Sequence, residues 1–209
     1  MRMARAGRFP IVSGVPVIGG LAVDGVQRGA IFLALCRKID FMNSSIPTVG
    51  RIPDLATLEE LFGKPVRSAR QESEHLGAEF RAFVEQSPFI IVATNGADGL
   101  DASAKGDPGG FVKVLNEKTL LIPERGGNGR NDSLRNIVAD SHVALTFFIP
   151  GMADLLRVNG QACLSIHPDL LLRFAKPPRC VIVVQVEEAF RQCSRAIQQS
   201  KLWSSANEE

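Results

Sequence analysis

The chain lacks any strong excess of charge of one sign. Its 24 lysines and arginines stand against 22 acidic residues, which leaves a formal net charge of +2 at pH 7. A protein that binds nucleic acid usually carries a broad basic field, and this composition does not provide one. We therefore expect no nucleic-acid partner, and any phosphate-binding site has to be a local one.

The chain also lacks cysteines and histidines at the spacings of ligands. Its four cysteines are scattered and form no CxxC pair: Cys36, Cys163, Cys180 and Cys193. They indicate free thiols in a reducing, cytoplasmic compartment rather than a disulfide framework. The 3 histidines lie far apart in the sequence, so no metal site is predicted. No GxSxG segment is present, which leaves a hydrolase nucleophile without support.

Long apolar runs are missing too, even in the unusual first 45 residues. After a basic start, residues 9–23 are apolar but broken by prolines and glycines, and Asp24 and Arg28 then interrupt the stretch. A membrane span needs ~20 apolar residues, so no membrane segment is predicted. A signal peptide fits poorly, because helix breakers fill its centre and no clean cleavage site follows. We expect residues 1–45 to be a disordered or non-native extension, with Met42 as the alternative start.

Residues 46–209 are predicted to form a single domain that begins with two helices. Thr57 and Glu60 have the spacing of a capping box, and Gly63 ends the apolar pattern, which together predict a short first helix. Apolar residues that recur four and three positions apart predict a second helix over residues 70–86.

From residue 89 onward the pattern is that of β-strands. Apolar, β-branched runs alternate with short turns rich in Gly, Asn, Asp and Pro, which favours antiparallel hairpins. The runs predict strands over 89–95, 100–106, 111–115, 119–123, 141–150, 155–166 (with a bend at Gly160) and 179–190. Short helices are predicted over 167–175 and 191–203. Many strands, short turns and few helices predict a mainly β fold, a small barrel with peripheral helices.

The segment PERGGNGRNDSLRNI, residues 123–137, joins a strand to a helix through three glycines and three arginines. It lacks the third glycine and the βαβ context of a dinucleotide-binding loop, and it lacks the Gly-Lys-Ser/Thr end of a P-loop. Two interpretations remain. In the first, Asp132 or Ser133 caps the helix, whose N-terminus binds a phosphate together with Arg130, and Arg125 and Arg135 are further candidates. In the second, the segment is a solvated loop.

The order of the elements over residues 100–162 is specific. A strand ends in Lys105-Gly106, and a hairpin and the Gly/Asn/Arg loop follow. A helix then ends near Asn136-Ile137, before an apolar strand and the sequence Arg-Val-Asn-Gly at 157–160. This core resembles the pyridoxamine 5′-phosphate oxidase-like superfamily, in particular a bacterial flavin-binding branch. A looser likeness extends from about residue 52 to the C-terminal SKLW. The resemblance implies a split β-barrel homodimer with FMN at the subunit interface.

The resemblance also implies roles for individual residues. Lys105 matches a lysine in contact with FMN, and Arg130 matches the second of two adjacent basic residues that hold the phosphate. Gly129 stands where the first would be, and Leu100 replaces a further arginine, so two basic contacts are missing; Arg125 is the candidate to compensate. The implied cofactor-binding residues are Ser103, Lys105, Ile122, Pro123, Arg125, Asn128, Arg130, Ser133 and Arg157.

We therefore expect an FMN-dependent oxidoreductase that acts on an unknown small molecule. The alternatives with the same fold are a non-catalytic flavin-binding protein and a deazaflavin-dependent reductase, and a structural barrel with a solvated loop is the alternative without a cofactor. In the oxidase proper, a C-terminal segment with Arg and His grips the substrate phosphate. Residues 188–203 contain Arg191 and Arg195 but no histidine. Pyridoxamine phosphate oxidation is therefore not expected, and no catalytic residue is predicted.

Overall fold

The computed structural model describes residues 52–64, 72–97, 99–127 and 129–203. The chain divides into two compact units, residues 1–65 and 66–209. The extension expected over residues 1–45 lies outside the described residues, so its nature stays a prediction, as does a domain boundary at residue 46. Within the described part of the chain, no helix is long and apolar enough to cross a membrane.

The first unit contains the helix α2 (Leu55–Phe62). The predicted capping box was wrong, because the N-cap is Asp54, whose Oδ1 accepts hydrogen bonds from both the N–H and the hydroxyl of Thr57 at 2.9 Å. A carboxylate three residues before an N–H of the first turn satisfies that donor directly. The helix ends as predicted at Gly63, whose φ of 78° suits glycine.

The second unit begins with the short strand β1 (Glu72–Ser73) and the helix α3 (Ala78–Gln86). The predicted helix start at residue 70 was therefore wrong. The Ser73 hydroxyl donates to the carbonyl of His75 and accepts from its N–H, and this local turn competes with a helix. Leu76 is buried, as its place in the helical pattern suggested, but it lies before the helix.

The other elements of this unit follow the predicted order. They are β2 (Phe89–Gly96), β3 (Gly99–Gly106), β4 (Lys113–Asn116), β5 (Thr119–Glu124), α4 (Asp132–Ala139), β6 (His142–Phe148), β7 (Leu155–Ser165), α5 (Pro168–Leu171), β8 (Cys180–Gln192) and α6 (Arg195–Gln199). The helix expected over 191–203 is shorter than predicted, because β8 continues to Gln192. The described strands pair antiparallel throughout, which confirms the predicted hairpins.

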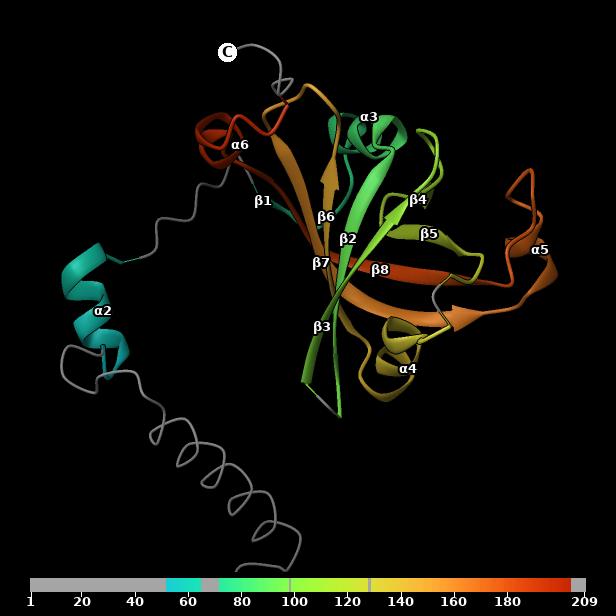
Figure 1. Ribbon diagram of the computed structural model, residues 1–209, viewed down its shortest axis with the longest axis horizontal. Coiled ribbons are helices and arrows are strands. Elements are labelled where there is room, and N and C mark those ends of the chain that lie inside the picture. Colours follow the sequence, from blue (N-terminus) through green and yellow to red (C-terminus); the bar gives the residue numbers. More distant parts are fainter. Residues whose placement is uncertain (1–51, 65–71, 98, 128, 204–209) are drawn as a thin grey trace, which may run out of the picture. The chain divides into compact units, whose positions relative to one another are not determined.

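The strands form one strongly curved sheet in the order β3-β2-β6-β7-β8-β5-β4, with β1 added to β8 (Figure 1). The two ends of this order are β3 and β4, so each presents one side that has no strand partner in the described sheet. The inner face carries the main core, which includes Ile90, Leu145 and Phe147, all with no exposed surface. The fold is therefore mainly β with peripheral helices, as predicted.

Gly160 lies where the sequence predicts a bend in a long strand. The register between β7 and β8 shifts between Asn159 and Gly160, which is a β-bulge. A Cβ atom at this position would lie only 2.0 Å from the carbonyl oxygen of Gln185. The glycine is therefore required by the close approach of the neighbouring backbone.

Candidate functional site

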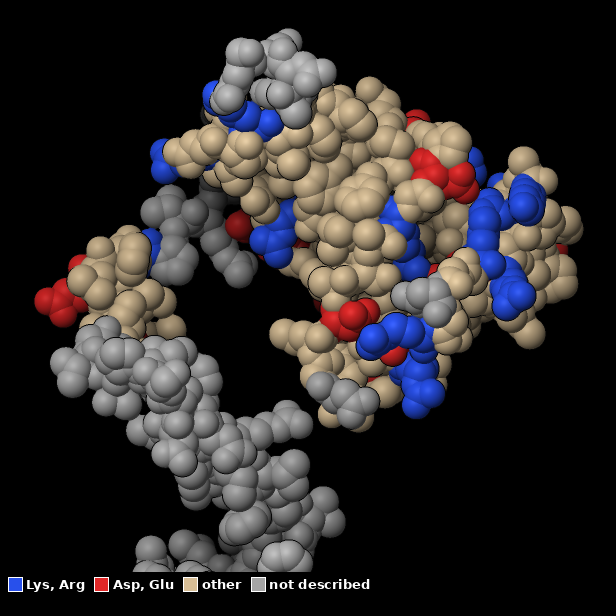
Figure 2. Space-filling view, in the orientation of Figure 1, with Lys and Arg blue, Asp and Glu red and all other residues tan. Residues whose placement is uncertain are grey.

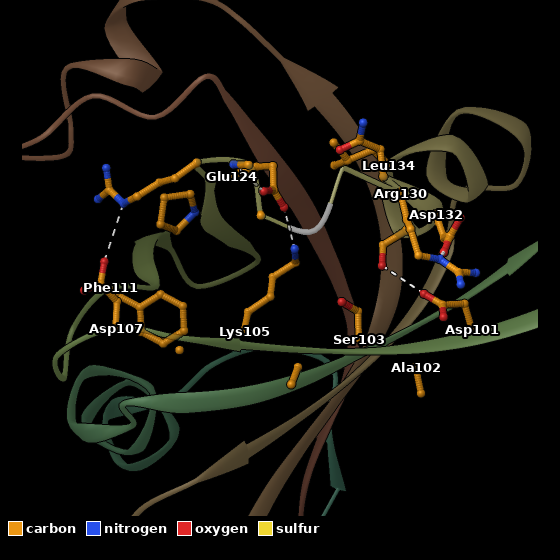
Figure 3. Close-up of a pocket in the computed structure, with 18 residues that line it drawn as sticks. Asp101, Ala102, Ser103, Lys105, Asp107, Phe111, Glu124, Arg130, Asp132 and Leu134 are labelled. Atoms are coloured by element: carbon orange, nitrogen blue, oxygen red, sulfur yellow. Dashed lines mark hydrogen bonds and ion pairs between the residues drawn. The ribbon is translucent and has the colours of Figure 1, made fainter.

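A cleft of about 810 Å³ lies along the edge strand β3. We call it the β3 cleft; its other walls are the end of β5, the glycine-rich loop and the first turn of α4 (Figure 3). Asp101, Ser103 and Lys105 alternate along β3 and are half-buried, whereas Ala102 and Ala104 between them are exposed. Small residues on an edge strand leave room for a flat ligand to approach the backbone closely.

Lys105 and Glu124 face each other across the β3 cleft (Figure 3). The Lys105 ammonium lies 2.5 Å from Oε2 of Glu124, and the two side chains are 15% and 14% exposed. Burial by itself raises the pKa of Glu124. The hydrogen bond from Lys105, the Gly126 N–H and the positive charge of Lys105 outweigh that effect and hold the pKa below its usual value. Glu124 is therefore ionised near neutral pH, and the ion pair fixes both side chains in position.

The glycine-rich loop turns sharply beside this ion pair. Gly126 and Gly129 have φ values of 83° and 76°, a region that favours glycine. The Arg179 guanidinium carbon lies 3.8 Å from the position that a Cβ of Gly126 would occupy. Sequence reasoning missed Arg179, since nothing in the motif points to it; only the pairing of β8 with β5 brings it to the loop.

The start of α4 differs from its prediction. The N-cap is Asn131, with a left-handed φ of 58° and no side-chain capping bond. Asp132 and Ser133 do not cap the helix. Asp132 accepts from Nε of Arg130 at 2.6 Å, and the buried Ser133 hydroxyl donates to Asp101 at 3.1 Å. Asp132 and Ser133 therefore pair with neighbouring side chains instead of capping the helix. The N-cap side chain accepts no hydrogen bond from the backbone N–H groups of the first turn.

The two arginines expected at a phosphate have different surroundings. Arg130 is 74% exposed at the cleft rim, and the ion pair with Asp132 raises its pKa. Arg125 also lines the cleft but is held elsewhere: Nη1 donates to the carbonyl of Lys176 at 2.5 Å, and Nε lies 3.5 Å from Asp107. Arg125 is therefore fixed between the β3–β4 loop and the segment that follows α5.

The β3 cleft brings together most of the predicted cofactor residues. Those that line it are Ser103, Lys105, Pro123, Arg125, Arg130 and Ser133. The side chain of Ile122 is fully buried in the core. Arg157 lies on the outer face of β7, its guanidinium 5.1 Å from the ring centre of Phe190, and is not part of the cleft wall in this chain. Asn128 lies outside the described residues. The binding role of each residue stays a prediction.

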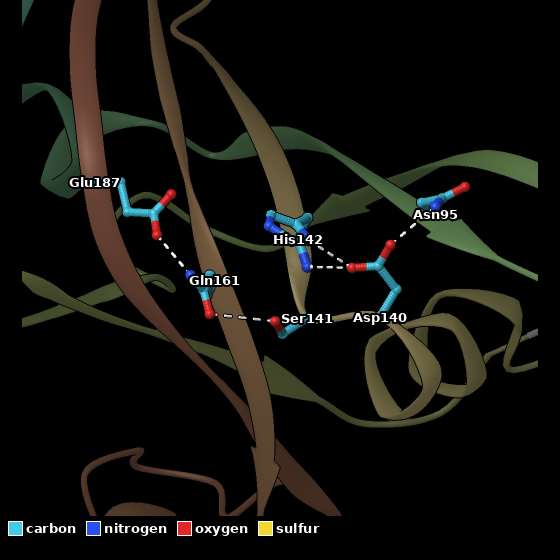
Figure 4. Close-up of polar contacts among 6 residues, drawn as sticks. All are labelled: Asn95, Asp140, Ser141, His142, Gln161 and Glu187. Carbon is cyan, nitrogen blue, oxygen red and sulfur yellow. Dashed lines mark hydrogen bonds and ion pairs between the residues drawn. The ribbon is translucent and has the colours of Figure 1, made fainter. Parts of the chain in front are cut away.

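A second polar group lies at the start of β6, apart from the cleft (Figure 4). Asp140 accepts from the backbone N–H of His142 and from Asn95, and its Oδ1 lies 2.6 Å from Nδ1 of His142. These hydrogen bonds lower the pKa of Asp140 to about 2, and the Asp140 carboxylate raises the pKa of His142. Beside them, Gln161 donates to Glu187 at 2.7 Å. These exposed contacts link neighbouring strands of the sheet.

The curved antiparallel sheet with an edge-strand cleft defines a split β-barrel. The family model for pyridoxamine 5′-phosphate oxidase matches residues 76–193, which is more than half of the chain. The chain therefore belongs to this family, and the resemblance drawn from residues 100–162 is confirmed. A search of the curated proteins found no match.

Solved structures similar to this chain have low sequence identity to it. HupZ of Group A Streptococcus is 18% identical, with a TM-score of 0.45, and the match covers 55% of this chain and 92% of that one. An F420 reductase is 20% identical, with a TM-score of 0.39 and coverages of 52% and 94%. An FMN-binding protein from Syntrophomonas wolfei is 8% identical, with a TM-score of 0.41 and coverages of 54% and 83%.

Proposed function

We propose that this protein binds FMN in the β3 cleft and is a homodimeric oxidoreductase that acts on a small molecule. The observation that carries the proposal is the meeting of three features at one cleft. These are Lys105 on an edge strand, a loop that turns through the positive-φ glycines Gly126 and Gly129, and a helix start without a side-chain cap. Family membership supports this proposal, because the notable features all fall within the matched residues.

The chemistry of the donors suits the phosphate of FMN. A phosphate monoester carries about two negative charges and accepts several hydrogen bonds. The first-turn N–H groups of α4 and the guanidinium of Arg130 are donors of the kind that bind such a group. Asp132 opposes this role, since it pairs with Arg130, so phosphate binding requires Arg130 to exchange a carboxylate for a phosphate. These donors fit the phosphate of FMN, and binding costs the free energy of breaking the ion pair between Arg130 and Asp132.

The wall formed by β3 suits the flavin ring. Ser103 presents a small side chain to the cleft, Ala102 points to the other side of the strand, and the unpaired edge of β3 offers backbone N–H and C=O groups. Lys105 lies at the end of this wall with its charge held by Glu124. The bound flavin would supply the redox chemistry, and the residues of this chain would bind and orient it.

The proposed homodimer is supported by the outer face of the sheet. Phe89 and Phe148 meet edge to face with ring centres 5.7 Å apart, and Phe89 is still 39% exposed. Arg157 lies on the same outer face, on the strand beside β6. A partner subunit on this face would cover both and could bring Arg157 to a shared cofactor. We also infer a reducing, cytoplasmic compartment from the scattered spacing of the cysteines in the sequence.

The test is the visible absorption of the purified full-length protein, followed by mass identification of any released chromophore. Flavin bands and released FMN are expected. Reduction of the bound flavin by a nicotinamide donor and its reoxidation in turnover would separate an enzyme from a flavin-storage protein. A protein that is colourless and also fails to bind added FMN would overturn the proposal.

One observation favours a deazaflavin-dependent reductase as the second candidate. Lys105, Arg125 and Arg130 each lie in an ion pair with a carboxylate of the cleft, and Asp101 adds one further negative charge. This balance weakens the attraction for a phosphate monoester relative to a cleft whose cations are unopposed. Tighter binding of a deazaflavin than of FMN in the same titration would favour this candidate.

A further inference from the structure

A second cleft of about 440 Å³ adjoins the β3 cleft and shares Asp107, Phe111 and Arg125 with it. We call it the α5 cleft, because its far wall is the segment that follows α5, with Phe174 and Lys176. Its near wall is the β3–β4 loop. Neither the predicted cofactor residues nor the proposed flavin site accounts for the residues of this far wall.

The α5 cleft is lined by more cations than carboxylates, whereas carboxylates outnumber cations in the β3 cleft. Three cations line it, Lys113, Arg125 and Lys176, against the single carboxylate of Asp107, which pairs with Arg125. Among the described residues, no carboxylate lies within ion-pair distance of the ammonium group of Lys113 or Lys176. Figure 2 shows Lys and Arg side chains gathered on the side of the molecule where Figure 1 places α5. An anion in this cleft could therefore contact Lys113 and Lys176 without displacing a carboxylate from either.

The walls of the α5 cleft are held in place by their own contacts. Arg125 bridges them, since it donates to the carbonyl of Lys176 and pairs with Asp107 on the opposite side. A Cβ at Gly109 would lie 3.1 Å from the Gln86 carbonyl, and Gly110 has a φ of 79°, so the loop packs tightly on the end of α3. The cleft is therefore formed before any ligand arrives, which lowers the entropic cost of binding.

The base of the α5 cleft is apolar. Phe111 and Phe174 line it and are largely buried, at 8% and 4% exposure. A volume of this size is within the range of ligand pockets, where apolar walls hold the body of a small molecule and a few polar groups orient it. Lysine and arginine select carboxylate or phosphate groups.

We propose that the α5 cleft binds the acidic group, a carboxylate or a phosphate, of a small organic substrate whose body extends toward the flavin in the β3 cleft. The identification of this ligand as a substrate rests on the proposed function. The binding site itself rests only on the α5 cleft. The chemical class is therefore that of small organic acids and phosphate esters, and neutral molecules are disfavoured.

The test is calorimetric titration of the full-length protein at constant ionic strength, with and without FMN. The probes are phenyl phosphate and benzoate, and benzyl alcohol is the neutral control. At least one anion is expected to bind and the alcohol is not, and the ratio of the two anion affinities tells phosphate from carboxylate recognition. Lys113→Gln and Lys176→Gln should each raise the Kd of the preferred anion about fivefold or more. Lys118→Gln, the same change on an exposed lysine in the β4–β5 turn, should leave it unchanged.

The outcomes for flavin and anion are separable. FMN affinity, followed by flavin fluorescence, should be the same in all three variants, and phenyl phosphate should perturb the absorption of the bound FMN. Lysine-dependent anion binding by a protein that does not bind FMN would overturn the proposed function and support the α5 cleft. Normal FMN binding with no anion binding, or with equal effects of Lys113→Gln and Lys118→Gln, would overturn the α5 cleft alone. Loss of anion binding when FMN is saturating would place the anion in the β3 cleft and also overturn the inference.

Discussion

Lys105 and Glu124 form an ion pair of 2.5 Å between two strands that lie far apart in the order of the sheet. Lys105 lies on β3, at one edge, and Glu124 ends β5, next to the opposite edge strand β4. Curvature of the sheet brings these strands together, and the ion pair spans the opening between them. The same contact therefore closes the barrel and fixes a cation in the wall of the β3 cleft.

Replacing Lys105 tests its role in the cleft. We expect Lys105→Met to weaken FMN binding about 10- to 100-fold, since a charge-assisted contact is lost while the carboxylate of Glu124 remains in the wall. Fluorescence titration with FMN measures the change. Lys118→Met is the matched control, because Lys118 is exposed and does not line the cleft. Equal affinities of the two variants would show that Lys105 does not contact the ligand.

Removal of the charge of Glu124 should change how the free energy of unfolding depends on pH in the acid range. The folded-state pKa of Glu124 lies below its ordinary value of 4.5, so its pairing stabilises the fold above that pH and is lost as the pH falls through the folded value. We expect Glu124→Gln to lower the free energy of unfolding by about 1 kcal/mol near neutral pH. The difference should shrink well below pH 4.5.

Urea unfolding of the wild type and of Glu124→Gln at a series of pH values provides this measurement. Asp140, with its pKa lowered to about 2, titrates in the same acid range. The informative quantity is therefore the difference between the two proteins at each pH. A difference that is constant down to the lowest pH would contradict ionisation of Glu124 as the cause.

The strands could be predicted from the sequence because their signals are local. Apolar alternation and turn residues placed β2 to β8 in the correct order, and Gly160 marked the bulge. The predictions failed at residues whose side chains bond to a partner far away in the sequence instead of to the nearby backbone. Ser133 bonds to Asp101 on β3 instead of capping α4. Arg179 reaches the glycine loop only through the pairing of β8 with β5, which no motif encodes.

Gly160→Ala should destabilise the fold through a backbone clash. The added Cβ would lie 2.0 Å from the Gln185 carbonyl oxygen, and a backbone atom in a paired strand has little freedom to move. We expect a loss of about 1–3 kcal/mol in the free energy of unfolding, measured with urea. Gly127→Ala is the control, since a Cβ there meets no atom within 4 Å. A wild-type stability for Gly160→Ala would mean that the bulge can relax.

Replacing Arg130 distinguishes a phosphate site from a solvated loop. If Arg130 exchanges Asp132 for the phosphate of FMN, Arg130→Ala should weaken FMN binding about tenfold or more and leave riboflavin binding nearly unchanged. Riboflavin shares the ring and lacks the phosphate, so the ratio of the two affinities isolates the contact. Arg135→Ala is the matched control, because Arg135 lies within α4 and is not among the residues that line the cleft.

Asp132→Asn extends the same test, because it removes the carboxylate that competes for Arg130. FMN should then bind more tightly than to the wild type, while riboflavin affinity stays the same. An equal loss of both ligands in Arg130→Ala would assign Arg130 to the loop conformation. No effect on either ligand in both variants would leave the segment before α4 as a solvated loop, and the phosphate would have to be bound by other residues of the cleft.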